Sequence, residues 1–271
     1  MASRKDKQGY LLIAGIVLLL VAFLGYKLSQ DKKSKPGPDN CVGTVKANTV
    51  IVLDHSEQIS DQTRSEIEAR AMAYIFGKVQ FNERVSVFTV SNVSKLALHP
   101  LVSRCRPPDE GNRLVEDTRR LQKRFVYSFE KPIRQALSIA PSASSESPIA
   151  QVLTDISLSQ YLRGERNTLL IYSDMLENTA KFTLYHCSAA AAVVSRYRES
   201  RKGAQERPTF INTNVVVNLV PSLGQSREVL SCRTQLWSWF FGDNEGANAS
   251  MAFDYLPGGT IADPSILGIK K

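Results

Sequence analysis

Residues 167–174 read Asn-Thr-Leu-Leu-Ile-Tyr-Ser-Asp, a continuous hydrophobic run that ends at an aspartate. Residues 49–54, Thr-Val-Ile-Val-Leu-Asp, end in the same way. Each run has the length of a strand. Apolar residues that do not alternate with polar ones are typical of a strand buried on both faces. The two runs therefore predict a parallel sheet that is covered by helices on both sides.

Beyond Cys41 the chain alternates between strand patterns and helix patterns. Further strands are predicted at 84–90, 95–102, 213–220 and 251–255, and helices at 61–78, 113–130, 132–139, from 148 onward, 188–201 and 226–241. Because Pro100 suits an edge, we expect 95–102 to be an edge strand that forms a hairpin with 84–90. The whole pattern predicts an α/β fold with a doubly wound, mostly parallel sheet and one antiparallel edge strand.

The segment from Tyr10 to Tyr26 contains no charged residue. Since about 17–25 residues span a bilayer, we expect 10–26 to form a transmembrane helix between a basic tail, 1–9, and a linker, 27–40. A cleaved signal peptide is disfavoured because no small-x-small cleavage site follows. The short basic tail favours export, and the basic run after the segment favours the opposite orientation. We expect a single-pass membrane protein whose domain, 41–271, lies outside the cytoplasm.

The net charge of +8 is unevenly distributed along the chain. Residues 1–35 hold seven Lys/Arg and two Asp/Glu, a net charge of +5, which leaves +3 for the rest. Nucleic acid is therefore not expected as a partner, and no nucleic-acid-binding motif is present. Two basic clusters lie on predicted helices, and we interpret both as solvated faces: Arg119, Arg120, Lys123 and Arg124, and Arg196, Arg198, Arg201 and Lys202.

The four cysteines form no CxxC pair, which argues against a structural zinc site. In the predicted topology, Cys41 and Cys105 both lie at the amino-terminal edge of the sheet. Cys187 and Cys232 lie on helices that follow neighbouring strands. We therefore predict the disulfides Cys41–Cys105 and Cys187–Cys232, as in proteins of oxidising compartments. Four free cysteines are the alternative.

The two aspartates that end the strands, Asp54 and Asp174, are candidate functional residues. In parallel α/β sheets, ligands bind outside the carboxyl ends of the strands. Carboxylate oxygens suit a hard cation such as Mg²⁺. The pair predicts a cation site at this edge of the sheet.

Three stretches of the chain resemble the von Willebrand factor A-type domain: Asp54-His55-Ser56-Glu57-Gln58, Ser147-Pro148-Ile149 and Tyr172-Ser173-Asp174-Met175. The resemblance implies a metal-ion-dependent adhesion site with Asp54, Ser56, Gln58, Ser147 and Asp174 as ligands of Mg²⁺ or Mn²⁺. Gln58 replaces the second serine of the family's Asp-x-Ser-x-Ser motif, which makes this copy degenerate. In such a site an acidic residue of a partner protein completes the metal shell. Strand-end aspartates that only cap helices are the alternative.

The resemblance implies a membrane-anchored binding module for another protein. The alternative is a metal-free docking subunit of an envelope or membrane complex that uses the aromatic segment 236–241. Its four aromatic residues cannot all face one side of a helix, so either one points outward as an anchor or the whole helix is buried. A metal-dependent phosphohydrolase is disfavoured because the phosphate-loop, GxSxG and HExxH motifs are missing from the sequence. We predict no catalytic residues.

Overall fold

The computed structural model describes residues 13–25, 36–54, 56, 58–90, 98–109, 117–139, 144–202, 204, 206–222, 224–242 and 248–257. The chain divides into two compact units, residues 1–37 and 38–271. Within the first unit, residues 13–25 are helical, whereas the predicted basic tail 1–9 lies outside the described residues.

The predicted transmembrane helix was wrong. No helix in the described part of the chain is both long and apolar enough to cross a membrane. The rest of the predicted span, 10–12 and 26, lies outside the described residues. The predicted single-pass membrane localisation and the membrane as a partner fail with this helix.

The second unit contains a six-stranded sheet in the order β3-β2-β1-β4-β5-β6. Its strands are β1 (Ala47–Leu53), β2 (Arg84–Thr89), β3 (Val102–Cys105), β4 (Arg166–Ser173), β5 (Thr213–Leu219) and β6 (Asn248–Tyr255). Only the pair β2–β3 is antiparallel; the other pairs are parallel. The predicted α/β sheet with one antiparallel edge strand is thereby confirmed.

The edge strand begins later than the predicted 95–102, of which 95–97 lie outside the described residues. The first backbone bond to β2 runs from Leu101 N to Val87 O, at 2.7 Å. Pro100 has no N–H to donate, and within the described residues the pairing with β2 follows it.

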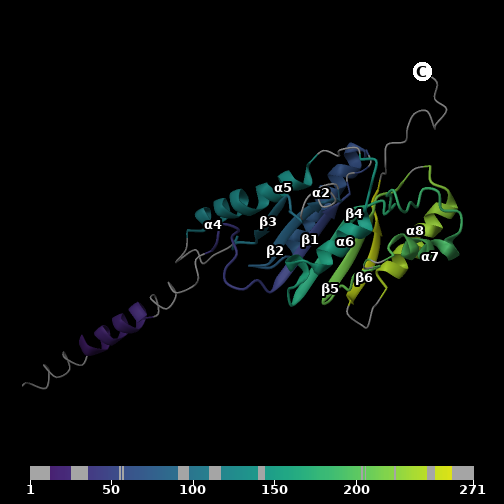
Figure 1. Cartoon of the computed structure of the whole chain (residues 1–271). Helices are drawn as coiled ribbons and strands as arrows, with labels where there is room; N and C mark the ends of the chain where they lie inside the picture. The colour runs from purple at the N-terminus through teal and green to yellow at the C-terminus, as the bar shows by residue number, and fades with distance from the viewer. Residues whose placement is uncertain are drawn as a thin grey trace, which may run out of the picture. The chain divides into compact units, whose positions relative to one another are not determined.

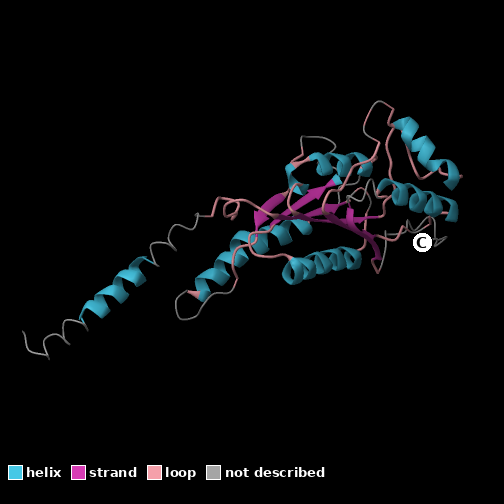
Figure 2. Cartoon of the chain, turned by 90° about the horizontal axis from the view of Figure 1, so that it is seen from below, coloured by secondary structure: helices cyan, strands magenta, loops and turns pink. Residues whose placement is uncertain are grey.

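Helices cover both faces of this sheet (Figure 1). The helices are α2 (Asp61–Lys78), α4 (Thr118–Phe125), α5 (Lys131–Leu137), α6 (Ile149–Leu158), α7 (Ala190–Ser200) and α8 (Arg227–Phe240), with a π-helix at Val126–Glu130 and a 3₁₀ turn at Gln160–Leu162. Figure 2, turned by 90°, shows the sheet between two helical layers. One core joins the sheet to α2 and α5, and the other joins it to α6, α7 and α8.

The surroundings of strand β1 explain why apolar and polar residues do not alternate along it. Ile51 and Leu53 belong to the core under α2 and α5, whereas Val50 and Val52 belong to the core under α6 and α8. Both faces of the strand are buried, so apolar residues occupy four consecutive positions, Val50 to Leu53. The next helix, α2, begins at Asp61, and Ser60 caps it: Ser60 Oγ accepts a hydrogen bond from Thr63 N at 3.1 Å.

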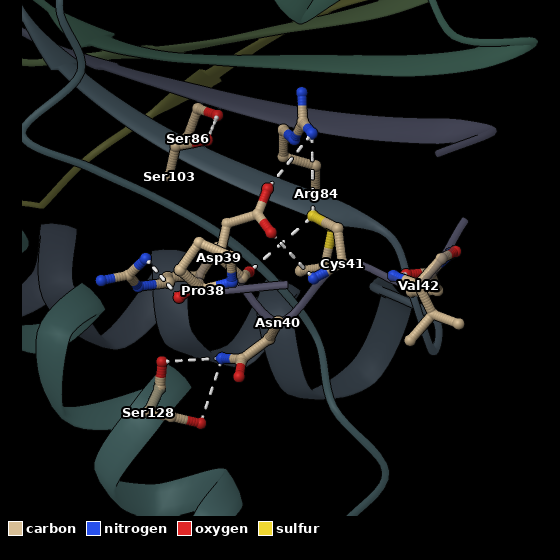
Figure 3. Close-up of a disulfide and its surroundings, with 12 residues drawn as sticks. Pro38, Asp39, Asn40, Cys41, Val42, Arg84, Ser86, Ser103 and Ser128 are labelled. Carbon is tan, nitrogen blue, oxygen red and sulfur yellow. Dashed lines mark hydrogen bonds and ion pairs between the residues drawn. A yellow bond between two sulfur atoms is a disulfide. The ribbon is translucent and has the colours of Figure 1, made fainter. Parts of the chain in front are cut away.

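Both predicted disulfides are confirmed. Cys41–Cys105 has a Cα–Cα distance of 4.9 Å, and Cys187–Cys232 has one of 6.3 Å. Figure 3 shows the first bond and its surroundings. There the side-chain amide of Asn40 donates to the carbonyl and hydroxyl oxygens of Ser128, each at 3.0 Å. The segment that leads into β1 is thus fixed to both the edge strand and the π-helix.

Candidate functional site

The carboxylate of Asp54, just after β1, collects hydroxyl groups from three segments of the chain. Its Oδ1 accepts from Ser56 N at 3.1 Å and from Ser56 Oγ at 2.7 Å. Its Oδ2 accepts from Ser147 Oγ at 3.1 Å and from Ser173 Oγ at 2.8 Å. The structure therefore brings together Asp54, Ser56 and Ser147, as the sequence predicts, and adds Ser173. We call these four residues the strand-end cluster.

Asp174 is engaged elsewhere. It is 7% exposed, and its Oδ1 accepts from Leu176 N at 2.9 Å while its Oδ2 accepts from Ser222 Oγ at 2.7 Å. Arg233 donates to its backbone carbonyl at 3.0 Å. Burial lowers the pKa of Arg233, and the charge of Asp174 opposes that shift. Asp174 thus joins the loop after β4 to the segment after β5.

Gln58, the fifth predicted ligand, is exposed. Among the described residues, Asp54 accepts hydrogen bonds from three serines and none from the side chain of Gln58. The five predicted ligands are therefore not assembled as one set.

The register of the sheet explains why Ser173 stands where Asp174 was expected. Leu53 pairs with Tyr172, and Asp54 N donates to Tyr172 O at 2.9 Å. The residue beside Asp54 at the strand end is therefore Ser173. Asp174 lies one position beyond the residue that pairs with Asp54, and a shift of one residue turns a side chain to the other face of the sheet.

The residues that come together do not fit the predicted metal centre. Asp54 is the carboxylate of the strand-end cluster, and three hydroxyl groups already donate to it. The described residues contain no group of three or more His, Cys, Asp or Glu side chains that could hold a metal ion. This finding contradicts the prediction of a metal-binding site. Occupancy by Mg²⁺ or Mn²⁺ in solution stays an untested prediction.

Glu177 is a buried acid near this edge, although its place in the sequence beside the site predicts a solvated side chain, so that prediction was wrong. It is 4% exposed, and its Oε2 accepts from Ala150 N at 2.8 Å in the first turn of α6. This bond replaces a side-chain cap, which Pro148 at the start of that helix cannot provide. Burial raises the pKa of Glu177 to about 8, and the charge of Asp54 adds to the rise, whereas the Ala150 N–H and Arg201 oppose it. Glu177 is therefore mostly protonated at pH 7.

The loop after β4 is held by further bonds on both sides. Asn178 forms isolated bridges with Ser147 and with Thr183. Met175 has a positive φ of 59°, and its carbonyl accepts from Trp237 Nε1 at 2.6 Å. These contacts, together with the strand-end cluster, join three loops at one edge of the sheet.

The aromatic segment 236–241 lies mostly in the core. Leu236, Trp237, Phe240 and Phe241 are buried. Trp239 is partly buried and its ring packs against that of Tyr197. The guanidinium of Arg207 lies over the Trp239 ring, 5.1 Å from its centroid. Of the two expectations for this helix, the buried one fits the structure, and the segment offers no open aromatic anchor.

Comparisons with known proteins add little to this geometry. No protein-family model matches the chain, and no curated protein matches it. Among solved structures, the crystal structure of the human COPII-coat protein Sec24c is similar, with 11% identity and a TM-score of 0.38. The match covers 83% of this chain and 30% of that chain. A likeness of this degree supports no statement about function, so what holds of the predicted resemblance is the α/β sheet with its antiparallel edge strand.

Proposed function

We propose that residues 38–271 form a binding module for another protein, without catalytic activity, and that the partner adds an extended segment to the edge strand β6. The observation that carries the proposal is the exposed, apolar outer half of this strand. The strand-end cluster joins the ends of β1 and β4, so the sheet that contains β6 can serve as a scaffold for binding.

Along β6, every residue from Met251 to Tyr255 is exposed. Met251, Phe253 and Tyr255 alternate along the strand and pair with Val215, Val217 and Leu219 of β5. The three β5 residues are buried, whereas Met251 is 39%, Phe253 38% and Tyr255 66% exposed. The apolar surface of the sheet thus continues beyond its covered part.

Natural proteins protect edge strands with charges, prolines or covering elements because unpaired N–H and C=O groups accept a further strand. Within Met251–Tyr255 there is one charged residue, Asp254, and no proline. In the described part of the chain, β6 pairs with β5 alone. A partner segment would gain main-chain hydrogen bonds from this edge and side-chain contacts from the exposed apolar residues.

Two neighbouring proline substitutions test this mode of binding. The N–H groups of successive strand residues point to opposite sides, so one of Ala252→Pro and Phe253→Pro removes a bond to β5 and the other removes only an outward donor. We expect the variant with the unchanged melting temperature to lose the partner.

A photoreactive residue at Met251 identifies the partner by crosslinking in the native cell, with the same residue at exposed Ile211 as the matched control. We expect a defined product from position 251 that disappears in the folded proline variant. If that variant gives the same product, or if positions 251 and 211 give the same products, strand pairing at β6 is wrong.

A further inference from the structure

The two basic clusters look alike in the sequence but differ in the partners that the structure gives them. In the cluster at α7, three of the four members have partners: Arg198 pairs with Glu206 at 2.7 Å, Lys202 pairs with Glu199 at 3.8 Å, and Arg201 donates to Gln151 at 2.6 Å. In the cluster on α4, four side chains are exposed and pair with no carboxylate of the described residues: Arg119, Arg120, Lys123 and Arg124. We call these four residues the α4 basic face.

Most arginines elsewhere in the described part of this domain pair with carboxylates or donate to backbone carbonyls, as Arg163 does to Leu158 O and Arg207 to Trp239 O. Ion pairs to carboxylates are made by Arg64, Arg70, Arg84, Arg106, Arg134 and Arg166. On α4, by contrast, like charges lie three and four positions apart, as in Arg120, Lys123 and Arg124, a spacing that destabilises a helix. Within the described residues no carboxylate offsets this repulsion, so counter-charges supplied by a partner would relieve it.

The helix is fixed from beneath while its basic face stays open. Phe125 and Phe129 are buried and their rings lie 5.4 Å apart. Between them, Tyr127 is 68% exposed on the π-helix, a local irregularity that is frequent at functional sites. Figures 1 and 2 both show α4 projecting beyond the end of the sheet. The α4 basic face therefore has room for a partner, with an aromatic side chain at its carboxyl end.

The positive face is short, and acids mark both of its ends. Asp117 caps the first turn by accepting from Arg120 N at 3.1 Å. Glu130 lies at the other end, where it pairs with Arg134 at 2.9 Å. The face spans only about 12 Å along an eight-residue helix. A short acidic segment matches the length of this face.

We propose that the α4 basic face, with Tyr127, binds a short acidic segment of a partner protein. Arginine and lysine side chains recognise carboxylates through charge-assisted hydrogen bonds, and guanidinium groups do so in pairs. This surface is independent of the β6 edge, because the π-helix and α5 pack near β3 and β2, at the opposite edge of the sheet. A negative result for the α4 basic face therefore does not bear on partner binding at β6, and the reverse also holds.

The test measures binding of the full chain to an octaglutamate peptide by fluorescence anisotropy. The α4 variant is Arg120→Glu with Arg124→Glu. The matched control is Arg196→Glu with Lys202→Glu, which changes the net charge equally at exposed positions on the α7 side. We expect the α4 variant to weaken binding by at least about tenfold and the control by less than about twofold. Circular dichroism and the melting temperature verify that both variants fold.

Parallel titrations with a single-stranded oligonucleotide of matching charge and with phosphatidylglycerol vesicles distinguish other anions. Peptide binding that is lost only in the α4 variant, and is tighter than binding to the other two probes, supports the proposal. Equal loss in both variants, tighter binding of the oligonucleotide or the vesicles, or no binding of the peptide by the wild-type chain would overturn it.

Discussion

The hydroxyl group of Ser173 donates to Oδ2 of Asp54 at 2.8 Å and accepts from Met175 N at 2.7 Å. This pair joins the carboxyl end of β4 to that of β1, the two strands between which the order of the sheet reverses. In doubly wound sheets such a position is normally a crevice for ligands. Here it is closed by hydroxyl groups that hold three loops together.

Replacing Ser173 with alanine should lower the free energy of unfolding by about 1–3 kcal/mol, because Met175 N loses its acceptor and Asp54 loses a donor. Urea denaturation measures the change. The control is Ser138→Ala, at an exposed helix end, where we expect a change within about 0.5 kcal/mol. An equal effect at both positions would show that the strand-end cluster carries no special stability.

Stability should depend on pH through Glu177. Its pKa is raised from the ordinary value of 4.5 to about 8 in the folded state. Between these two values the folded protein holds a proton that the unfolded chain has released, so this group makes stability fall as the pH rises, at up to about 1.4 kcal/mol per pH unit. The loss is complete above pH 8.

Glu177→Gln removes this slope, since glutamine resembles the protonated acid and can still accept from Ala150 N. We expect the variant to match the wild type near pH 5 and to exceed it near pH 8.5, as measured by urea midpoints across that range. Glu146→Gln, at an exposed position nearby, should leave the wild-type slope unchanged. A variant Glu177→Gln with the wild-type slope would contradict the assignment.

Each disulfide should contribute about 4 kcal/mol through loop-closure entropy, since the bonds span sequence separations of 64 and 45 residues. The pairs Cys41→Ala with Cys105→Ala, and Cys187→Ala with Cys232→Ala, test them one at a time by denaturation. The oxidised protein should also yield both linked peptide pairs in mass spectrometry. Recovery of four alkylated thiols from the native protein would refute the bonds.

Trp237→Phe should destabilise the domain more than Trp239→Phe does. Trp237 is buried and its Nε1 donates to Met175 O at 2.6 Å, so phenylalanine leaves that carbonyl unsatisfied at a cost of about 1–3 kcal/mol. Trp239 is partly buried and lies beneath the guanidinium of Arg207. Thermal denaturation of the two variants gives the ranking, and the reverse order would show that the Met175 contact is not the one that matters.

The sequence predicts most of the fold because buried parallel strands leave a strong pattern. The runs at 49–54 and 167–173 correspond to β1 and β4, and the helix predicted at 61–78 has the bounds of α2. The edge strand was misplaced because the pattern of 95–102 does not reveal where pairing begins after Pro100. The aromatic segment 236–241 was ambiguous because burial on two sides of a helix depends on which elements cover it.

The site was less predictable, because it depends on register. Asp54 and Asp174 occupy similar places in their own runs, but β1 and β4 pair so that Ser173 lies beside Asp54. Nothing in either run fixes that one-residue offset. The prediction of a solvated Glu177 failed for a related reason: its burial arises from the helix start at Ala150, which is distant in the sequence.

The disulfide between Cys41 and Cys105 has a mechanical consequence. A pulling force that reaches the domain through the residues before Cys41 passes across this bond directly to β3, so β1, α2 and β2 lie outside the path of the load. In the same way, Cys187–Cys232 carries the load past α7 and β5. While both bonds are intact, tension along the chain therefore bears on β4, on β6 and on the helices outside the two closed loops, and β1, β2 and β5 cannot be drawn out by it.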